Sequence, residues 1–198
     1  KIVLSAQNFG LYCEGGKSED LGAFRPLCVN CSGVMGGQTA GNAALRYPLG
    51  TLFVKPYGAS FAEVVGLNDS GQAVLNAKFG SLWRAYLYDS FHGLRQIVFP
   101  GSGTPQNCEA VAIGQDGTVV GHCGAHPWVA APGSTAAMAP EATPGWEVLS
   151  VTGVDWLSVV AVTVIGVAGG GPAVRTWVFV PFIVENGPAG MLPPLLAA

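Results

Sequence analysis

Short apolar segments alternate with turns of glycine, asparagine and aspartate along most of the chain. Segment 66–75 (GLNDSGQAVL) has an aliphatic residue, a polar turn and a second apolar run, and segment 112–121 (AIGQDGTVVG) follows the same plan. Turn residues that tolerate a positive φ angle, placed between strand-forming residues, are typical of a β-hairpin. Segment 28–37 (CVNCSGVMGG) repeats the plan, and segment 153–162 (GVDWLSVVAV) is a degenerate further copy. The pattern therefore predicts one small β unit repeated about four times.

The same set of strands surrounds each hairpin. The reference positions that align the four copies are Gly33, Gly71, Gly117 and Ser158. A third strand is expected at 42–46, 84–88, 126–130 and 175–179, and a fourth at 51–55, 94–99, 146–149 and 182–185. Four short strands per ~40–46 residues is the period of a propeller blade, and such a unit must stack on its neighbours to bury its faces.

These observations predict an all-β fold of about four four-stranded antiparallel blade-like repeats, which form a small or incomplete β-propeller. A β-sandwich of irregular hairpins is the alternative. The expected organisation is an N-terminal strand and linker at 1–23, one repeat domain at 24–185 and an apolar C-terminal tail at 186–198. The blades are expected at about 24–60, 61–107, 108–150 and 151–185. Because a free tail is normally polar, this one is expected to dock on its own domain or on a neighbouring subunit.

The hairpin plan resembles the HAF repeat of bacterial extracellular proteins. In that repeat, an aliphatic-Asn-x-x-Gly-x-Val-Val-Gly pattern precedes a strand of the His-Ala-Phe type. Here the resemblance lies in 67–71 and 113–121 and in the strands 84–88 and 126–130, and it extends over about 24–185. No copy contains His-Ala-Phe itself, and the fourth copy lacks the turn glycine. The resemblance implies an extracellular propeller-like array and brings no catalytic residue with it.

Sparse charge narrows the classes of function. Only 11% of the residues are charged and the net charge is −3, so no basic surface for nucleic acid or an anionic membrane is expected. No apolar run reaches the ~20 residues that a membrane-spanning helix needs. Few charges also permit close association between copies. Because the chain begins at Lys1 rather than Met, we interpret it as a mature protein that is secreted, extracellular or at the cell surface.

Two of the five cysteines are predicted to pair from the register of the third hairpin. If Gln115 and Asp116 form its turn, the numbers of cross-strand partners sum to 231, and Cys108 then lies opposite Cys123. Directly opposed antiparallel residues are close enough for a disulfide. We therefore expect a disulfide between Cys108 and Cys123.

A second disulfide is expected between Cys13 and either Cys28 or Cys31, and two disulfides indicate an oxidising compartment. A zinc site built from Cys28, Cys31, Cys123 and His126 is the competing interpretation. It is disfavoured because its two halves lie much farther apart in the chain than those of a zinc finger. It also needs Cys123, which the hairpin register already assigns.

No set of residues indicates a catalytic, cofactor or metal site. The sequence has no Gly-x-Ser-x-Gly nucleophile elbow to accompany its three histidines, His92, His122 and His126. Acids recur in the turns, at Asp69, Asp116 and Asp155, but without the ligand density that calcium needs. We expect no enzyme, no cofactor and no metal. The tryptophans are expected to pack between blades.

The sequence thus favours a non-catalytic, secreted structural protein that self-associates into an extracellular assembly or filament by exchanging strands or its tail. Its expected partner is a second copy of the chain. The alternative is a secreted glycan- or protein-binding module that uses the rim loops Phe79–Trp83 and Pro100–Asn107. A hydrolase, which would need one of the histidines beside an acid in a cleft, is the third hypothesis.

Overall fold

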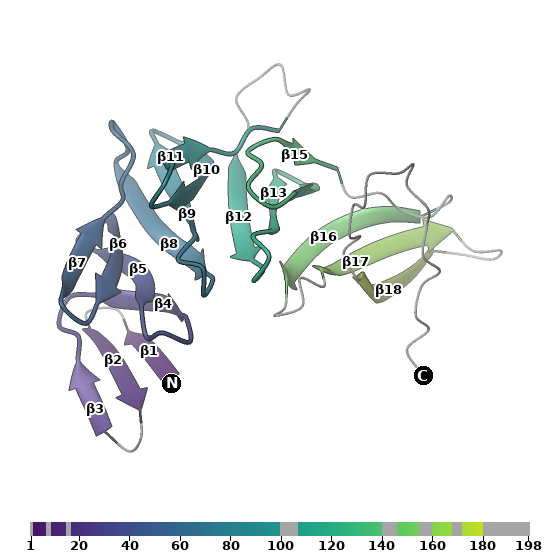
Figure 1. Ribbon diagram of the computed structural model, residues 1–198. Helices are drawn as coiled ribbons and strands as arrows, with labels where there is room; N and C mark the ends of the chain where they lie inside the picture. Colours follow the sequence, from purple (N-terminus) through teal and green to yellow (C-terminus); the bar gives the residue numbers. More distant parts are fainter. Residues whose placement is uncertain are drawn as a thin grey trace.

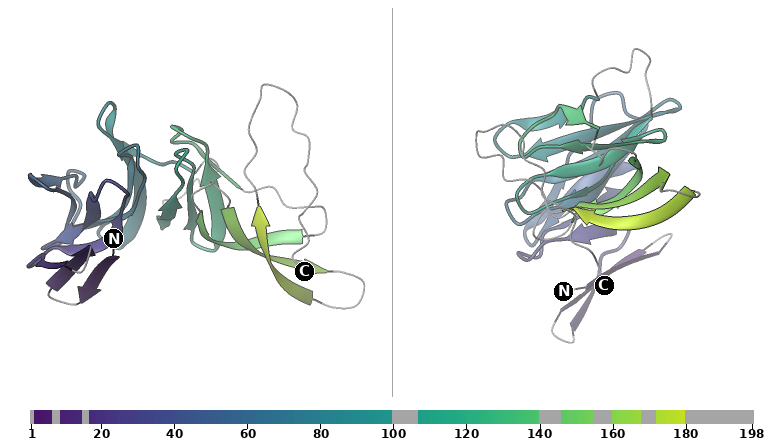
Figure 2. Two further views of the ribbon diagram at one scale, coloured as in Figure 1. Left: turned by 60° about the horizontal axis from the view of Figure 1, so that its bottom comes forward. Right: turned by 90° about the vertical axis from the view of Figure 1, so that its right-hand side faces the viewer.

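The structure is a computed structural model that describes residues 2–6, 9–14, 17–99, 107–139, 146–154, 160–167 and 172–179. In this part the chain is all-β, and five antiparallel sheets follow one another along it, each strand paired with its neighbour in sequence (Figure 1). The sheets stack one behind another in a row (Figure 2). Among the described strands no pairing joins the first sheet to the last, so the row is open.

The five sheets are numbered along the chain. Sheet 1 contains β1 (Ile2–Ala6), β2 (Phe9–Glu14) and β3 (Lys17–Asp20). Sheet 2 contains β4 (Arg25–Val29), β5 (Met35–Thr39), β6 (Asn42–Tyr47) and β7 (Gly50–Phe53). Sheet 3 contains β8 (Phe61–Leu67), β9 (Ala73–Phe79), β10 (Leu82–Asp89) and β11 (Gly93–Gln96). Sheet 4 contains β12 (Cys108–Ile113), β13 (Val119–Cys123), β14 (His126–Ala130) and β15 (Ala137–Met138), and sheet 5 contains β16 (Trp146–Val154), β17 (Val160–Val167) and β18 (Pro172–Phe179).

The predicted unit of four antiparallel strands is confirmed in sheets 2, 3 and 4. In each of them the turn between the first two strands contains a glycine with positive φ, which is the conformation that favours glycine. These are the reference positions of the repeat, Gly33, Gly71 and Gly117, with φ angles of 82°, 78° and 93°. The turn chemistry read from the sequence therefore places the hairpins correctly.

Each first hairpin also carries a β-bulge at the same place in the unit. One extra residue lies in the first strand of sheets 2 to 5, namely Leu27, Val65, Val111 and Thr152, with a second bulge at Leu149 in sheet 5. The first four have the same spacing along the chain as the reference positions Gly33, Gly71, Gly117 and Ser158. A bulge bends its strand and increases the local twist, so every first strand bends at the same point.

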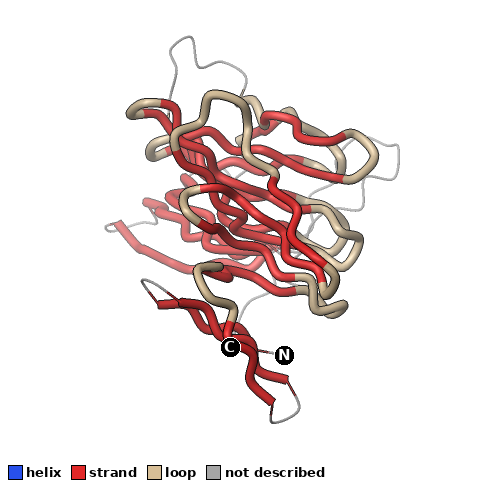
Figure 3. The backbone as a smooth tube through the Cα atoms, turned by 90° about the vertical axis from the view of Figure 1, so that its left-hand side faces the viewer, coloured by secondary structure: helices blue, strands red, loops and turns tan. Residues whose placement is uncertain are grey.

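The core lies between consecutive sheets. Leu45, Val64 and Leu75 are fully buried between sheets 2 and 3. Leu87 and Trp128 are fully buried between sheets 3 and 4. Burying one such side chain contributes about 1.5–3 kcal/mol, so each sheet depends on its neighbours for stability. Figure 3 shows the resulting layers of strands, one sheet behind another.

The predicted fourth strand of the third copy is wrong. The sequence predicts it at 146–149, but Trp146 begins the first strand of sheet 5, and the fourth strand is the two-residue β15. So short a strand leaves no apolar pattern in the sequence. Hydrogen bonds with Val98, which follows sheet 3, help to position β15. The Val98 N–H donates to the Thr135 carbonyl, and the Ala137 N–H donates to the Val98 carbonyl. The boundary expected at 150 therefore falls inside β16.

The N-terminal region also differs from the expectation. The sequence predicts a single strand and a linker for 1–23, whereas β1, β2 and β3 form a complete three-stranded sheet there. The four residues of β3, Lys17–Asp20, are all polar or charged, and such residues are uncommon in strands, so the sequence does not indicate a strand there. The fourth strand predicted at 182–185 and the tail at 186–198 lie outside the described residues.

Candidate functional site

The structure contains the predicted disulfide between Cys108 and Cys123. The two residues are cross-strand partners in β12 and β13, as the sum of 231 requires. The turn itself is one residue longer than expected, because the Gly114 N–H donates to the Thr118 carbonyl. The bulge at Val111 compensates for that extra residue before the strand reaches the cysteines. Two departures from the simple hairpin thus cancel.

The second predicted disulfide has two alternatives, and the structure removes one of them. Cys28 carries a free thiol and packs against the core between sheets 2 and 3. Burial raises the pKa of this thiol to about 12, although a hydrogen bond with the backbone of Gly36 acts in the opposite direction. The side chain of Cys13 lies outside the described residues, so its pairing with Cys31 stays a prediction.

The first turns of successive sheets are joined by a ladder of buried amides. Asn30 Nδ2 donates to the Asn68 carbonyl at 3.2 Å, and Asn68 Nδ2 donates to the Gly114 carbonyl at 3.2 Å. Donor and acceptor are 38 and 46 residues apart, which is the repeat spacing. Asn30 is 7% exposed and Asn68 is fully buried. The equivalent positions of the repeat therefore lie on top of one another in space.

A second set of rungs lies on the exposed side of the turns, where the backbone of one turn donates to a side chain of the next. The Cys31 N–H donates to Asp69 Oδ1 at 2.7 Å, and the Asp69 N–H donates to Gln115 Oε1 at 2.9 Å. In the third turn, Asp116 accepts hydrogen bonds from the backbone and the hydroxyl of Thr118, both at 2.8 Å. These acids therefore serve the turns, as ordinary turn chemistry predicts.

A buried asparagine connects sheets 3 and 4 at the bulge. Asn76 on β9 is 4% exposed. Its Nδ2 donates to the Ala110 carbonyl at 2.9 Å, and its Oδ1 accepts from the Ala110 N–H at 2.7 Å. Ala110 directly precedes the bulged Val111, where the regular ladder of β12 is interrupted. Sequence reasoning missed this contact, and its signal is a single polar residue within the otherwise apolar first half of β9.

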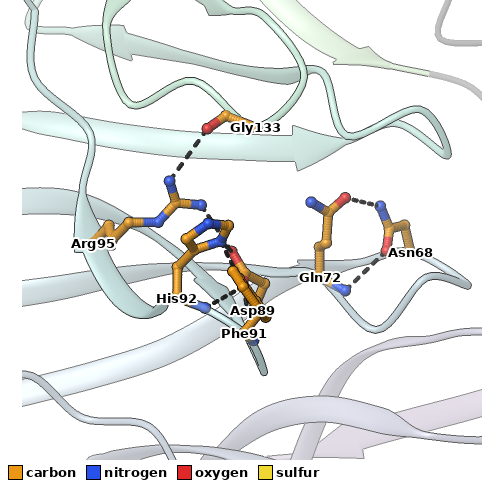
Figure 4. A network of polar contacts seen from close by, with 7 residues as sticks. All are labelled: Asn68, Gln72, Asp89, Phe91, His92, Arg95 and Gly133. Atoms are coloured by element: carbon orange, nitrogen blue, oxygen red, sulfur yellow. Dashed lines mark hydrogen bonds and ion pairs between the residues drawn. The ribbon is translucent and has the colours of Figure 1, made fainter.

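A polar cluster fixes the turn between β10 and β11 (Figure 4). Asp89 accepts hydrogen bonds from the N–H groups of Phe91 (2.9 Å) and His92 (2.6 Å), and Arg95 donates to it at 2.7 Å. Arg95 also donates to the Gly133 carbonyl of sheet 4 at 3.2 Å. Burial raises the pKa of the Asp89 carboxyl, but the hydrogen bonds from His92, Phe91 and Arg95 outweigh it and hold the pKa below its ordinary value.

The arrangement of the histidines gives no support to the hydrolase hypothesis. His92 belongs to sheet 3 and is exposed, with 53% of its side chain accessible, and its acidic neighbour Asp89 is engaged in the turn. His122 and His126 belong to sheet 4, where the first is half-buried and the second exposed. Within the described ranges, no group of three or more His, Cys, Asp and Glu residues is placed to hold a metal ion.

Of the two rim loops predicted to bind glycan, the first lies wholly within the described residues. Trp83 is half-buried, and its ring meets the Phe61 ring edge-on at 5.8 Å between centroids. Lys78 Nζ lies 5.7 Å from the centroid of the Trp83 ring. The backbone N–H of Trp83 donates to Asn107 Oδ1 at 2.9 Å, which brings the end of the second loop beside the first. Residues 100–106 lie outside the described residues.

Exposed apolar side chains gather along one edge of sheet 2. The outer strand of this sheet is β7, and all four of its residues are exposed (Figure 1). Together with its flanks it forms what we call the β7 patch: Tyr47, Leu49, Leu52, Phe53 and Tyr57. Between residues 47 and 57 the sequence has a single charged residue, Lys55. An edge strand with apolar side chains and so little charge is a template for association with another chain.

The described residues contain no helix that could span a membrane. A comparison with protein-family models gives no match, and a comparison with curated proteins gives none either. Of the nine large apolar side chains that are exposed in the described part of the chain, five belong to the β7 patch.

Proposed function

We propose that this chain is a non-catalytic, secreted structural protein that self-associates into an extracellular assembly. The observation that carries the proposal is the β7 patch. Natural edge strands are usually protected by charge, proline, bulges or a covering segment. In β7 all four residues are exposed, and none of them is charged. Pairing of this edge with a second copy would satisfy its main-chain groups and bury its apolar side chains.

The strength of a contact through the β7 patch follows from the free energy gained by burial and the free energy lost on association. Full burial of one large apolar side chain contributes about 1.5–3 kcal/mol. Association of two proteins costs about 4–15 kcal/mol in lost freedom. The five side chains of the β7 patch therefore give a gain of the same order as the cost. One patch supports reversible association, and a durable assembly needs a second contact between copies.

Two further observations support the secreted part of the proposal. The disulfide between Cys108 and Cys123 is typical of proteins from oxidising compartments. The hairpin plan of the repeat resembles that of HAF-repeat proteins, which are extracellular. The low charge of the chain, −3 over 198 residues, offers little electrostatic resistance to association.

Sedimentation velocity over a range of protein concentrations tests the proposal. We expect the wild-type mass to rise with concentration, and Phe53→Lys to lower it because a charge then lies on the edge strand. Phe91→Lys is the matched control, since Phe91 is equally an exposed aromatic, at 88%, but lies outside the patch. A wild-type chain that remains a monomer at every concentration would contradict self-association.

A glycan-binding module is the second candidate, and one contact favours it. The hydrogen bond from the Trp83 backbone N–H to Asn107 Oδ1 holds a half-buried aromatic residue, with an apolar ring and a polar indole N–H, beside the end of the second predicted rim loop. Titration with glycans should then show binding that Trp83→Ala abolishes. A glycan array without a hit would leave self-association as the function.

A further inference from the structure

The outer strands of the described sheets differ in how well they are protected against pairing with another chain. The last strands of sheets 1 to 4 are β3, β7, β11 and β15. Three of the four residues of β3 are charged, β11 carries Arg95 in its ion pair with Asp89, and β15 is only two residues long. Charge and shortness are devices that keep an edge from pairing. Among these four strands, β7 alone combines four exposed residues with the absence of charge.

The pairing of β7 with β6 fixes which of its main-chain groups are free. The Val54 N–H donates to the Ala43 carbonyl at 3.0 Å, so this pair, which continues the register of β6 and β7, is hydrogen-bonded. In an antiparallel ladder such pairs alternate with pairs that are not hydrogen-bonded. Leu52 therefore bonds to β6, whereas Thr51 and Phe53 do not. The N–H and carbonyl groups of Thr51 and Phe53 point away from β6, on the exposed edge of the sheet.

These free groups match those of a second β7 in one antiparallel register. When Leu52 lies opposite Leu52 of the other copy, Thr51 of each copy lies opposite Phe53 of the other. Both free residues of both strands then belong to hydrogen-bonded pairs, each of which exchanges two N–H···O=C bonds. A shift by two residues leaves only one such pair within β7, and a shift by one residue sets free groups against groups already bonded to β6. The register centred on Leu52 is therefore the one that satisfies the edge completely.

The side chains are also compatible in this register. The two Leu52 side chains meet at a position that is not hydrogen-bonded, where opposed side chains are closest. Phe53, 59% exposed, lies beside Thr51 of the other copy, and an aromatic residue opposite a β-branched one stabilises a sheet. Lys55 falls opposite Leu49 of the other copy, so the two Lys55 residues lie six residue steps apart, about 20 Å along the strands. Salt screens repulsion between exposed charges at that distance.

We propose that two copies of the chain pair β7 with β7 about a two-fold axis that passes between the two Leu52 residues. The contact joins sheet 2 of one copy to sheet 2 of the other as one continuous sheet, with β7 of each copy at its centre (Figure 1). Because both copies use the same surface, the contact closes a pair and leaves no β7 free for a third copy. The inference rests on the proposed self-association and deepens it by giving the symmetry of the contact. A larger assembly is then built from such pairs through another surface.

A single cysteine at the axis tests the proposed symmetry. Leu52→Cys is purified under reducing conditions and oxidised at a concentration at which the wild type associates, and the products are separated without reductant. Equivalent residues of two copies meet only at a two-fold axis, so we expect most of this variant in a two-chain species whose peptide map joins residue 52 to residue 52. Leu49→Cys is the matched control, because Leu49 is fully exposed but lies about 20 Å from its equivalent in the pair, and it should lose most of that product. The wild-type chain with its own five cysteines, oxidised in parallel, gives the background.

A proline on the edge provides a measurement that needs no cross-link. Thr51→Pro removes an outward N–H that β6 does not use, and proline is tolerated on an edge strand where its N–H side faces solvent. The variant should therefore keep its circular dichroism spectrum and sediment as a monomer at concentrations at which the wild type associates. Thr51→Val is the matched control, since it keeps both the N–H and the β-branched shape, and it should associate as the wild type does.

The outcomes separate the two proposals. An assembly that forms without the 52–52 link, and equally well in Thr51→Pro and Thr51→Val, overturns the pairing of β7 with β7 but leaves self-association intact. A wild-type chain that remains a monomer at every concentration and gives no linked species as Leu52→Cys overturns both.

Discussion

Replacing the buried Asn76 by alanine should be one of the most destabilising single changes in the described part of the chain. Asn76→Ala removes both hydrogen bonds to the backbone of Ala110, at 2.9 and 2.7 Å. A buried polar group without a partner costs about 1–3 kcal/mol, and here one N–H and one carbonyl lose theirs. The expected loss is about 2–5 kcal/mol, a large share of the roughly 5–15 kcal/mol that is typical of a folded protein.

Urea denaturation followed by circular dichroism measures this loss as a lower midpoint. Asn42→Ala is the matched control, because Asn42 is only half-buried and its side-chain hydrogen bonds reach the carbonyls of Thr39 (3.4 Å) and Ala40 (3.2 Å) within its own turn. We expect the control to lose less than about 1 kcal/mol. If both variants unfold at the same urea concentration, the contact between Asn76 and Ala110 does not stabilise the junction and the reasoning fails. A split of the transition into two steps would instead show that sheets 3 and 4 unfold separately.

Three further changes test other contacts. Replacing Cys108 and Cys123 by alanine should lower the free energy of unfolding by about 3 kcal/mol, the value for a closed loop of ~15 residues, as measured by urea denaturation. The pKa of the Asp89 carboxyl is lowered in the folded state, so its contribution to the free energy of unfolding is present above the unfolded pKa and is lost as the pH falls through the folded pKa. In Asp89→Asn the melting temperature should therefore fall less steeply with decreasing pH than in the wild type. The Cys28 thiol, with a pKa raised to about 12, should resist iodoacetamide at pH 8 in the native protein and react in urea, and equal rates in both states would contradict its burial.

The repeat could be recognised from the sequence because its turns need particular residues. A glycine with positive φ recurs at Gly33, Gly71 and Gly117, and so the spacing of the units is visible in the chain itself. The pairing of Cys108 with Cys123 followed from the same turns. It is correct although the turn is longer than assumed, because the bulge at Val111 offsets the extra residue.

Sheet 1 could not be recognised in this way. Its strands share lengths and register with β5, β6 and β7, but Ile2–Ala6 and Met35–Thr39 have no residue in common at equivalent positions. The likeness lies in strand length and backbone register, and the residue types at these positions do not show it. The two-residue β15 was missed for a related reason, since its position depends on hydrogen bonds with the distant Val98.

The sequence predicts association between copies, but it does not show where an exposed apolar edge lies on the molecule. Low charge and an apolar tail indicated association, yet nothing in the sequence distinguishes Leu52 and Phe53 on the exposed β7 from the equally apolar residues of the core. Only the pairing order of the sheet shows that this strand is outermost. The contact from Asn76 to Ala110 likewise requires that two sheets be placed relative to each other.

The amide ladder bears on how such an array can change its length during evolution. Both of its long rungs end on a backbone carbonyl, that of Asn68 and that of Gly114, and every residue type supplies that acceptor. A unit that carries the donor amide is therefore compatible with almost any successor, and duplication of a unit needs no matching mutation in its neighbour. Gly114 has no side chain that could donate to a following turn. Insertion of a further unit of this type should therefore disturb the fold less before sheet 4 than after it.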